Sequence, residues 1–116
     1  MKFSRLFTRT EAEQTLPLVR RIVHDILESA SQARELDESD PERDEILRTI
    51  QDLFEELEEI GCFYKDWSFS VGLVDFPATI DGELVFLCWR SDEPELAWYH
   101  PIEEGYAGRR PLPPSA

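Results

Sequence analysis

Three side chains that could bind a ligand or take part in a reaction are predicted to meet in the C-terminal half of the chain. They are the Asp75 carboxylate, the Cys88 thiol and the Arg90 guanidinium. An arginine fork binds carboxylate or phosphate through two parallel hydrogen bonds, so Arg90 indicates a small anionic-ligand site. A catalytic thiol at Cys88 is less favoured, because no base has an assured position from which to deprotonate it. The pattern also fits a plain charge network of Asp75, Arg90 and Glu95 on a solvated sheet face, which would contribute little to stability.

Metal ligands are present, but their spacing does not indicate a complete site. His24 and Glu28 are one helical turn apart, and two ligands alone do not hold an ion. Cys62 and Cys88 are not part of a CxxC motif, so we expect two free thiols. The sequence therefore predicts no metal site and no cofactor.

The N-terminal half has the pattern of two long amphipathic helices. Thr8 and Glu11 match a capping box, which places the start of the first helix at Thr8 or within two residues of it. Pro17 conflicts with a helix interior, so we expect a kink there or a short first helix that ends near it. Asp40 is the expected N-cap of the second helix, and Gly61 is its expected stop. Apolar residues at alternating spacings of three and four, as in a coiled coil, form a seam on each helix: Ala12, Leu16, Val19, Val23, Ile26, Ala30 and Ala33 on the first, and Ile46, Ile50, Leu53, Leu57 and Ile60 on the second.

The segment after these helices has the pattern of an antiparallel hairpin. Asp81-Gly82 favours a tight two-residue turn, which joins a strand at 73–80 to a strand at 83–90. With that turn, Asp75 is expected opposite Cys88 on the neighbouring strand.

A third strand is predicted at 95–100, after a turn in which Arg90 faces Glu95. This register places His100 on the sheet face opposite to Arg90. Pro77 cannot donate a backbone hydrogen bond, so the first strand of the hairpin is expected at the outer edge of the sheet.

Together these elements predict a single α+β domain over residues 1–116. It consists of a helical hairpin at 8–61, a three-stranded antiparallel β-meander at 71–100 and an irregular C-terminal segment at 101–116.

The charge of the chain excludes several classes of partner. The 116 residues include 25 acids and 12 bases, giving a net charge of −13. Such a surface repels phosphate backbones and anionic lipid, so we expect neither nucleic acid nor membrane as the main partner. The chain begins without a signal-peptide pattern and has no apolar stretch near the roughly 20 residues that cross a bilayer, so we expect a cytoplasmic protein.

Several short sequence motifs resemble those of the uncharacterised bacterial family known as domain of unknown function 2203 (DUF2203). The matching motifs are Phe7-Thr, Glu11-Ala, Leu16-Pro17, Gly72-Leu-Val-Asp-Phe-Pro77, Cys88-Trp-Arg90, Trp98-Tyr-His100 and Gly105-Tyr-Ala-Gly108-Arg109. The resemblance covers nearly the whole chain, but it implies no activity, substrate or cofactor.

Within those motifs, some residues are less easily explained by packing, and we take them as a hypothetical ligand site. Arg90 and Arg109 would bind an anion, and Asp75 would orient one of them. His100 completes the set of four first choices. Cys88 and Tyr106 are second choices.

Two functions from different classes follow from the sequence. The unbroken apolar seams favour a non-enzymatic interaction module, which dimerises through its helices as a four-helix bundle or docks a protein partner. The alternative is a small anionic-ligand-binding or catalytic domain with a polar site on the sheet and the C-terminal loop. We favour the interaction module over an enzyme.

Overall fold

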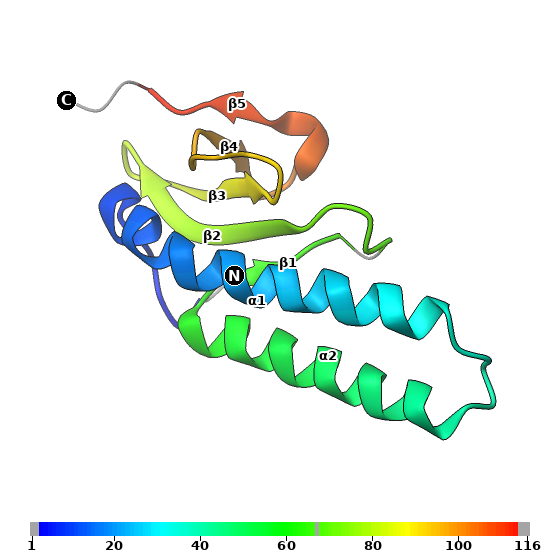
Figure 1. Cartoon of the computed structure of the whole chain (residues 1–116). Coiled ribbons are helices and arrows are strands. Elements are labelled where there is room, and N and C mark those ends of the chain that lie inside the picture. Colours follow the sequence, from blue (N-terminus) through cyan, green and yellow to red (C-terminus); the bar gives the residue numbers. More distant parts are fainter. Residues whose placement is uncertain (1–2, 67, 114–116) are drawn as a thin grey trace.

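Two antiparallel helices and an antiparallel sheet make up the fold (Figure 1). The structure is a computed structural model that describes residues 3–66 and 68–113, so the last three residues of the predicted C-terminal segment lie outside the described part. The helices are α1 (Arg9–Arg34) and α2 (Pro41–Ile60). The sheet has five strands in the order β1-β2-β3-β4-β5, namely β1 (Phe63–Tyr64), β2 (Leu73–Ile80), β3 (Glu83–Arg90), β4 (Trp98–Pro101) and β5 (Arg110–Pro111), with the 3-10 helix η1 (Tyr106–Gly108) before β5.

The predicted helix ends are confirmed. The Thr8 side chain accepts from the Glu11 backbone N–H, and the Glu11 side chain accepts from the Thr8 backbone N–H, which completes the capping box. The Asp40 side chain accepts from the Glu42 backbone N–H at the start of α2. Gly61 ends α2 with a φ of 108°, a left-handed conformation that glycine adopts without strain.

The short form of the first helix is wrong, because α1 continues through Pro17 to Arg34. Proline inside a helix costs about 3 kcal/mol, since it removes a hydrogen bond and crowds the preceding turn. Pro17 lies on the exposed side of α1, where water can solvate the carbonyl that loses its partner. Burial of the adjacent Leu16 and Val19 in the core offsets the cost.

The helical layer lies on one face of the sheet. Figure 1 shows α1 between the sheet and α2, with both helices extending beyond the sheet toward their connecting loop. The apolar seam of α1 is buried as predicted, whereas α2 buries only Ile50 and Leu57 fully. The core combines that seam with side chains from one face of the central strands, among them Val74, Phe76, Ala78, Val85, Leu87 and Trp89.

The predicted β2–β3 hairpin is confirmed, with Asp75 opposite Cys88. Its turn residues Asp81 and Gly82 have φ values of 51° and 81°, as a two-residue hairpin turn requires. The outer position predicted for β2 is wrong, because β1 pairs with its first half and the Phe7 backbone N–H donates to the Pro77 carbonyl at 2.7 Å.

The remaining strands differ from the prediction. The sheet has five strands rather than three, and the C-terminal segment contains η1 and β5 instead of being irregular throughout. The strand predicted at 95–100 is β4, which begins at Trp98 rather than at Glu95. It pairs one residue out of the expected register, with His100 opposite Phe86. A shift of one residue moves every side chain of a strand to the other face, so His100 joins the face that carries Cys88.

Candidate functional site

Four of the six predicted site residues line one pocket on the face of the sheet away from the helices. The pocket has a volume of about 260 Å³ and includes Asp75, Cys88, His100 and Tyr106. Asp75 comes from β2, Cys88 from β3 and His100 from β4, and all three are buried. The remaining lining residues are Lys65, Leu73, Phe86, Ile102 and Gly105.

His100 is held by hydrogen bonds at both ring nitrogens. Its Nδ1 lies 2.8 Å from the Pro101 carbonyl oxygen, and its Nε2 lies 3.1 and 3.2 Å from the two carboxylate oxygens of Asp75. Burial alone would lower the pKa of His100, but hydrogen bonds with Asp75, Cys88 and the Pro101 carbonyl, together with the Asp75 charge, raise it to about 10. The Asp75 carboxyl and the Pro101 carbonyl thus favour the protonated form of His100.

Both predicted anion-binding arginines lie outside the lining of this pocket and are bonded to other groups. The Arg109 guanidinium donates to both carboxylate oxygens of Glu93, at 2.9 and 2.6 Å, and to the Cys88 carbonyl. Arg90 donates to Asp92 at 2.6 Å and to the Tyr106 hydroxyl at 2.5 Å. Asp75 contacts His100 instead of either arginine, so the expected network of Asp75 with Arg90 is replaced by local pairs.

Glu93 organises this region, and sequence reasoning assigned it only to a turn. Its carboxylate accepts from the Arg90 backbone N–H at 2.8 Å as well as from Arg109, and its carbonyl accepts from the Trp89 indole N–H at 3.0 Å. These bonds fold residues 91–97 into a longer connection than the predicted turn. The only signal in the sequence was a glutamate before Pro94, which does not distinguish this role from a surface turn.

The His24–Glu28 pair and the Cys62 thiol, which the sequence also singled out, are separate from the pocket. His24 lies 3.3 Å from Glu28 on α1, and both side chains are exposed. Cys62 is buried below α2, and desolvation raises the pKa of its thiol to about 12. It is therefore a neutral packing residue at physiological pH.

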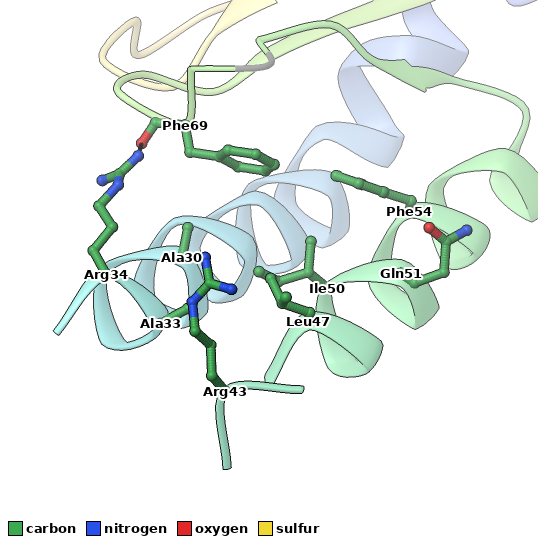
Figure 2. Close-up of a pocket in the computed structure, with 9 residues that line it drawn as sticks. All are labelled: Ala30, Ala33, Arg34, Arg43, Leu47, Ile50, Gln51, Phe54 and Phe69. Atoms are coloured by element: carbon green, nitrogen blue, oxygen red, sulfur yellow. Dashed lines mark hydrogen bonds between the residues drawn. The ribbon is translucent and has the colours of Figure 1, made fainter. Parts of the chain in front are cut away.

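A second hollow, of about 310 Å³, lies between the helices near their connecting loop (Figure 2). Leu47 is the most open of its apolar residues, with 42% of its surface exposed. The wall opposite α2 is Phe69, whose loop is fixed to α1 because Arg34 donates to the carbonyls of Ser68 and Phe69. The full lining is Ala30, Ala33, Arg34, Arg43, Leu47, Ile50, Gln51, Phe54 and Phe69.

This hollow continues along α2 into a neighbouring one of similar size. The neighbouring hollow shares Gln51 and Phe54 with the hollow around Leu47, and it adds Glu58 and the β1 region. The Phe54 ring separates them, with its centroid 5.3 Å from the Tyr64 ring and 6.1 Å from the Phe69 ring. One face of α2 thus presents a continuous strip, which we call the α2 strip: Arg43, Leu47, Gln51, Phe54 and Glu58.

The fold and its sites define an α+β domain with a pocket of mixed polar and apolar lining on the sheet and a partly apolar strip along α2. Neither helix in the described part of the chain has the length and apolar character that crossing a bilayer requires. Residues 5–112 match a family described as "Uncharacterized conserved protein (DUF2203)", so the chain belongs to that family, as its sequence motifs indicated. No curated protein and no solved structure was found to match the chain.

Proposed function

We propose that this protein is a non-enzymatic self-association module that forms a homodimer through the α2 strip. The observation that carries the proposal is the open apolar hollow around Leu47, on a helix whose seam the sheet and α1 leave only partly covered. Exposed apolar area of this kind is typical of surfaces that bind another protein.

The occupant we propose is a second copy of the chain, because the strip is complementary to itself. Arg43 lies at one end of the α2 strip and Glu58 at the other, with Leu47 and Phe54 between them. A two-fold axis near the middle of α2 would run the two helices antiparallel. Each Arg43 would then meet Glu58 of the second copy, and each Leu47 would meet Phe54.

The charges favour this register over others. Residues 25–60 contain fourteen acids and three bases, so most arrangements of two such surfaces place carboxylates against carboxylates. Neither the Arg43 guanidinium nor the Glu58 carboxylate makes an ion pair within the described residues, so both are available to a partner. Like charges in contact penalise the wrong arrangements, and Arg43 selects the antiparallel one.

The size of the strip predicts a weak, reversible dimer. The strip from Arg43 to Glu58 is about 22 Å long, and a helix with its side chains is about 10–12 Å across, so two copies joined through the strip alone bury about 500 Å² in total. This area is below the roughly 1,200 Å² at which stable interfaces begin, so we expect weak, reversible association rather than a permanent dimer.

Sedimentation velocity over a range of concentrations tests the proposal. We expect wild type to change from monomer to dimer as concentration rises, and Leu47→Glu to remain monomeric. The matched control is Leu18→Glu, which places the same charge on an equally exposed leucine of α1 outside the strip. Leu18→Glu should dimerise like wild type. A wild type that stays monomeric at about 200 µM, or equal weakening by both substitutions, would contradict the proposal.

A further inference from the structure

Three different metal-ligating side chains converge at the floor of the sheet pocket. The Asp75 carboxylate, the Cys88 sulfur and an imidazole nitrogen of His100 all lie within 4.8 Å of one another. They project from three adjacent strands, and each is at most 4% exposed. Rigid strands and near-complete burial hold the three atoms in place before anything binds.

The hydrogen bonds of His100 match those of a histidine that ligates a metal. The Pro101 carbonyl can only accept, so Nδ1 carries a proton and donates to it over 2.8 Å. In neutral His100 the lone pair of Nε2 then faces the Asp75 carboxylate, whose nearer oxygen is 3.1 Å away. A cation must lie between these two electron-rich groups, and that cation is either a proton or a metal ion. A ring N–H bonded to a backbone carbonyl is the usual way in which proteins orient a metal-binding histidine.

We propose that Asp75, Cys88 and His100 bind a divalent transition metal of the zinc class, with Nε2, Sγ and a carboxylate oxygen as ligands. A set of one nitrogen, one sulfur and one oxygen suits Zn²⁺ and its usual substitute Co²⁺, and disfavours Mg²⁺ and Ca²⁺, which take oxygen ligands. The observed separation of Nε2 and the carboxylate is close to an edge of a tetrahedron with metal–ligand bonds of about 2 Å.

Three protein ligands leave one tetrahedral position for another group. The pocket of about 260 Å³ lies against the three ligands, so it is the natural direction for that fourth position. Lys65 lines the same pocket, with its ammonium 5.5 Å from the Phe86 ring centroid. The fourth ligand is therefore expected to be water or a small anion, which the Lys65 charge would favour.

The three proposed ligands are separate from the proposed dimer surface, because none of them lines either hollow beside the α2 strip. Lys65 lines both the sheet pocket and the hollow beside Glu58. A second group of three ligand types, His24, Asp25 and Glu28, lies on α1, but all three residues are exposed and their charges are solvated. The buried group is the stronger candidate, since its side chains are shielded from water and are held on adjacent strands before an ion binds.

Titration with Co²⁺ and Zn²⁺ after chelator treatment of the full chain tests the proposal. Tetrahedral Co²⁺ with a thiolate ligand gives visible ligand-field bands and a near-ultraviolet sulfur-to-cobalt charge-transfer band. We expect both to saturate at one ion per chain and to be reversed by Zn²⁺. Zn²⁺ binding should also release protons, because the histidine and the thiol must be deprotonated to ligate the ion.

Paired cysteine variants make the test specific. Cys88→Ala should abolish the charge-transfer band and weaken Zn²⁺ binding by about 100-fold or more, whereas Cys62→Ala removes an equally buried thiol and should retain both. Circular dichroism checks that each variant is folded. Asp75→Asn, which keeps the side-chain shape, should also weaken Zn²⁺ binding, and His24→Ala should not. Absence of saturable binding in wild type, or a charge-transfer band that persists in Cys88→Ala, would overturn the proposal.

Discussion

His100 and Asp75 face each other across the intervening strand β3, with Nε2 of His100 3.1 Å from Oδ1 of Asp75 and both side chains almost fully buried. A buried histidine–carboxylate pair does not by itself indicate high stability, because desolvation of the two groups opposes their attraction. Removing one partner is a different matter, since it leaves the other group buried without its counterpart.

The first prediction follows from that asymmetry. In chelator-treated protein, Asp75→Asn should lower the free energy of unfolding by about 3 kcal/mol, because the carboxylate that stabilises protonated His100 is lost. Urea denaturation at neutral pH measures the effect. The exposed Asp92→Asn, which removes the partner of Arg90, is the control and should cost less than about 1 kcal/mol. Similar losses in the two variants would show that the buried pair has no special role.

The second prediction concerns pH. The pKa of His100 is raised from 6.5 to about 10, so the folded state holds the proton more tightly than the unfolded state. The resulting stabilisation is complete below about pH 6.5 and is lost as pH rises toward 10. The groups that face His100 are Asp75 and Cys88, while Lys65 and Tyr106 line the same pocket.

Urea midpoints of the chelated protein at about pH 6, 8 and 10 measure this loss. Other groups also titrate near pH 10, so the comparison with Asp75→Asn isolates the pair. Wild type should lose more stability across this range than the variant. Parallel pH profiles would contradict the ion pair.

Structure that depends on local bonds could be predicted from the sequence. The Thr8 capping box joins residues three positions apart, and the Asp81-Gly82 turn joins adjacent strands, so each is encoded within a short window. The two-residue strands β1 and β5 could not be predicted, because a strand of that length has no recognisable alternation. Their pairing depends on the strands that they join.

The residues of the candidate site could be predicted from the sequence, but the contacts between them could not. Asp75, Cys88 and His100 were all named, yet a register one residue away placed His100 on the wrong face. The connection that leads into β4 contains Glu93, which bonds to the backbone of Arg90 and to Arg109, 16 positions later. A long-range bond of this kind leaves no local pattern in the sequence.

The third prediction tests whether Arg109 is structural rather than ligand-binding. Its side chain is 10% exposed and bonded to both oxygens of Glu93, and its guanidinium lies 5.0 Å from the Trp98 ring centroid. Arg109→Met should cost about 2 kcal/mol of stability, because it leaves the Glu93 carboxylate unpaired in a partly buried position. Arg110→Met is the matched control, since Arg110 pairs with Glu104 in solvent, and it should cost about 0.5 kcal/mol or less. Equal costs, measured by urea denaturation, would refute this role.

The fourth prediction concerns the close approach of β2 to α1. A Cβ on Gly72 would lie 2.2 Å from Cγ1 of Val23, which is too close for any side chain. Gly72→Ala should therefore destabilise the protein by about 1–3 kcal/mol through overpacking. Val23→Ala removes the obstructing methyl group, so the double variant should be more stable than the sum of the two single effects.

A double-mutant cycle measures this coupling, which we expect to exceed about 1 kcal/mol. Val19→Ala is the control, because Val19 is an equally buried residue of α1 and is not among the nearest neighbours of a Cβ on Gly72. Its effect should add to that of Gly72→Ala. Additive effects for Val23 as well would mean that the glycine is not required for this contact.

The antiparallel contact between Arg43 and Glu58 of two copies is the central claim of the proposed dimer. Within one chain these residues are about 22 Å apart along α2, so any coupling between them must act between chains. The two-fold dimer contains this contact twice. Arg43→Glu would place two glutamates together at both contacts, and Glu58→Arg would place two arginines together at both. Each should weaken dimerisation about tenfold.

Sedimentation equilibrium of the charge-swap series is the most direct measurement of that claim. We predict that the double variant Arg43→Glu with Glu58→Arg recovers the dimerisation of wild type, because each swapped pair is again of opposite charge. Arg48→Glu and Glu56→Arg make the same changes in net charge on other faces of α2 and should leave dimerisation nearly unchanged. A double variant as weak as the sum of its single changes would contradict the antiparallel dimer.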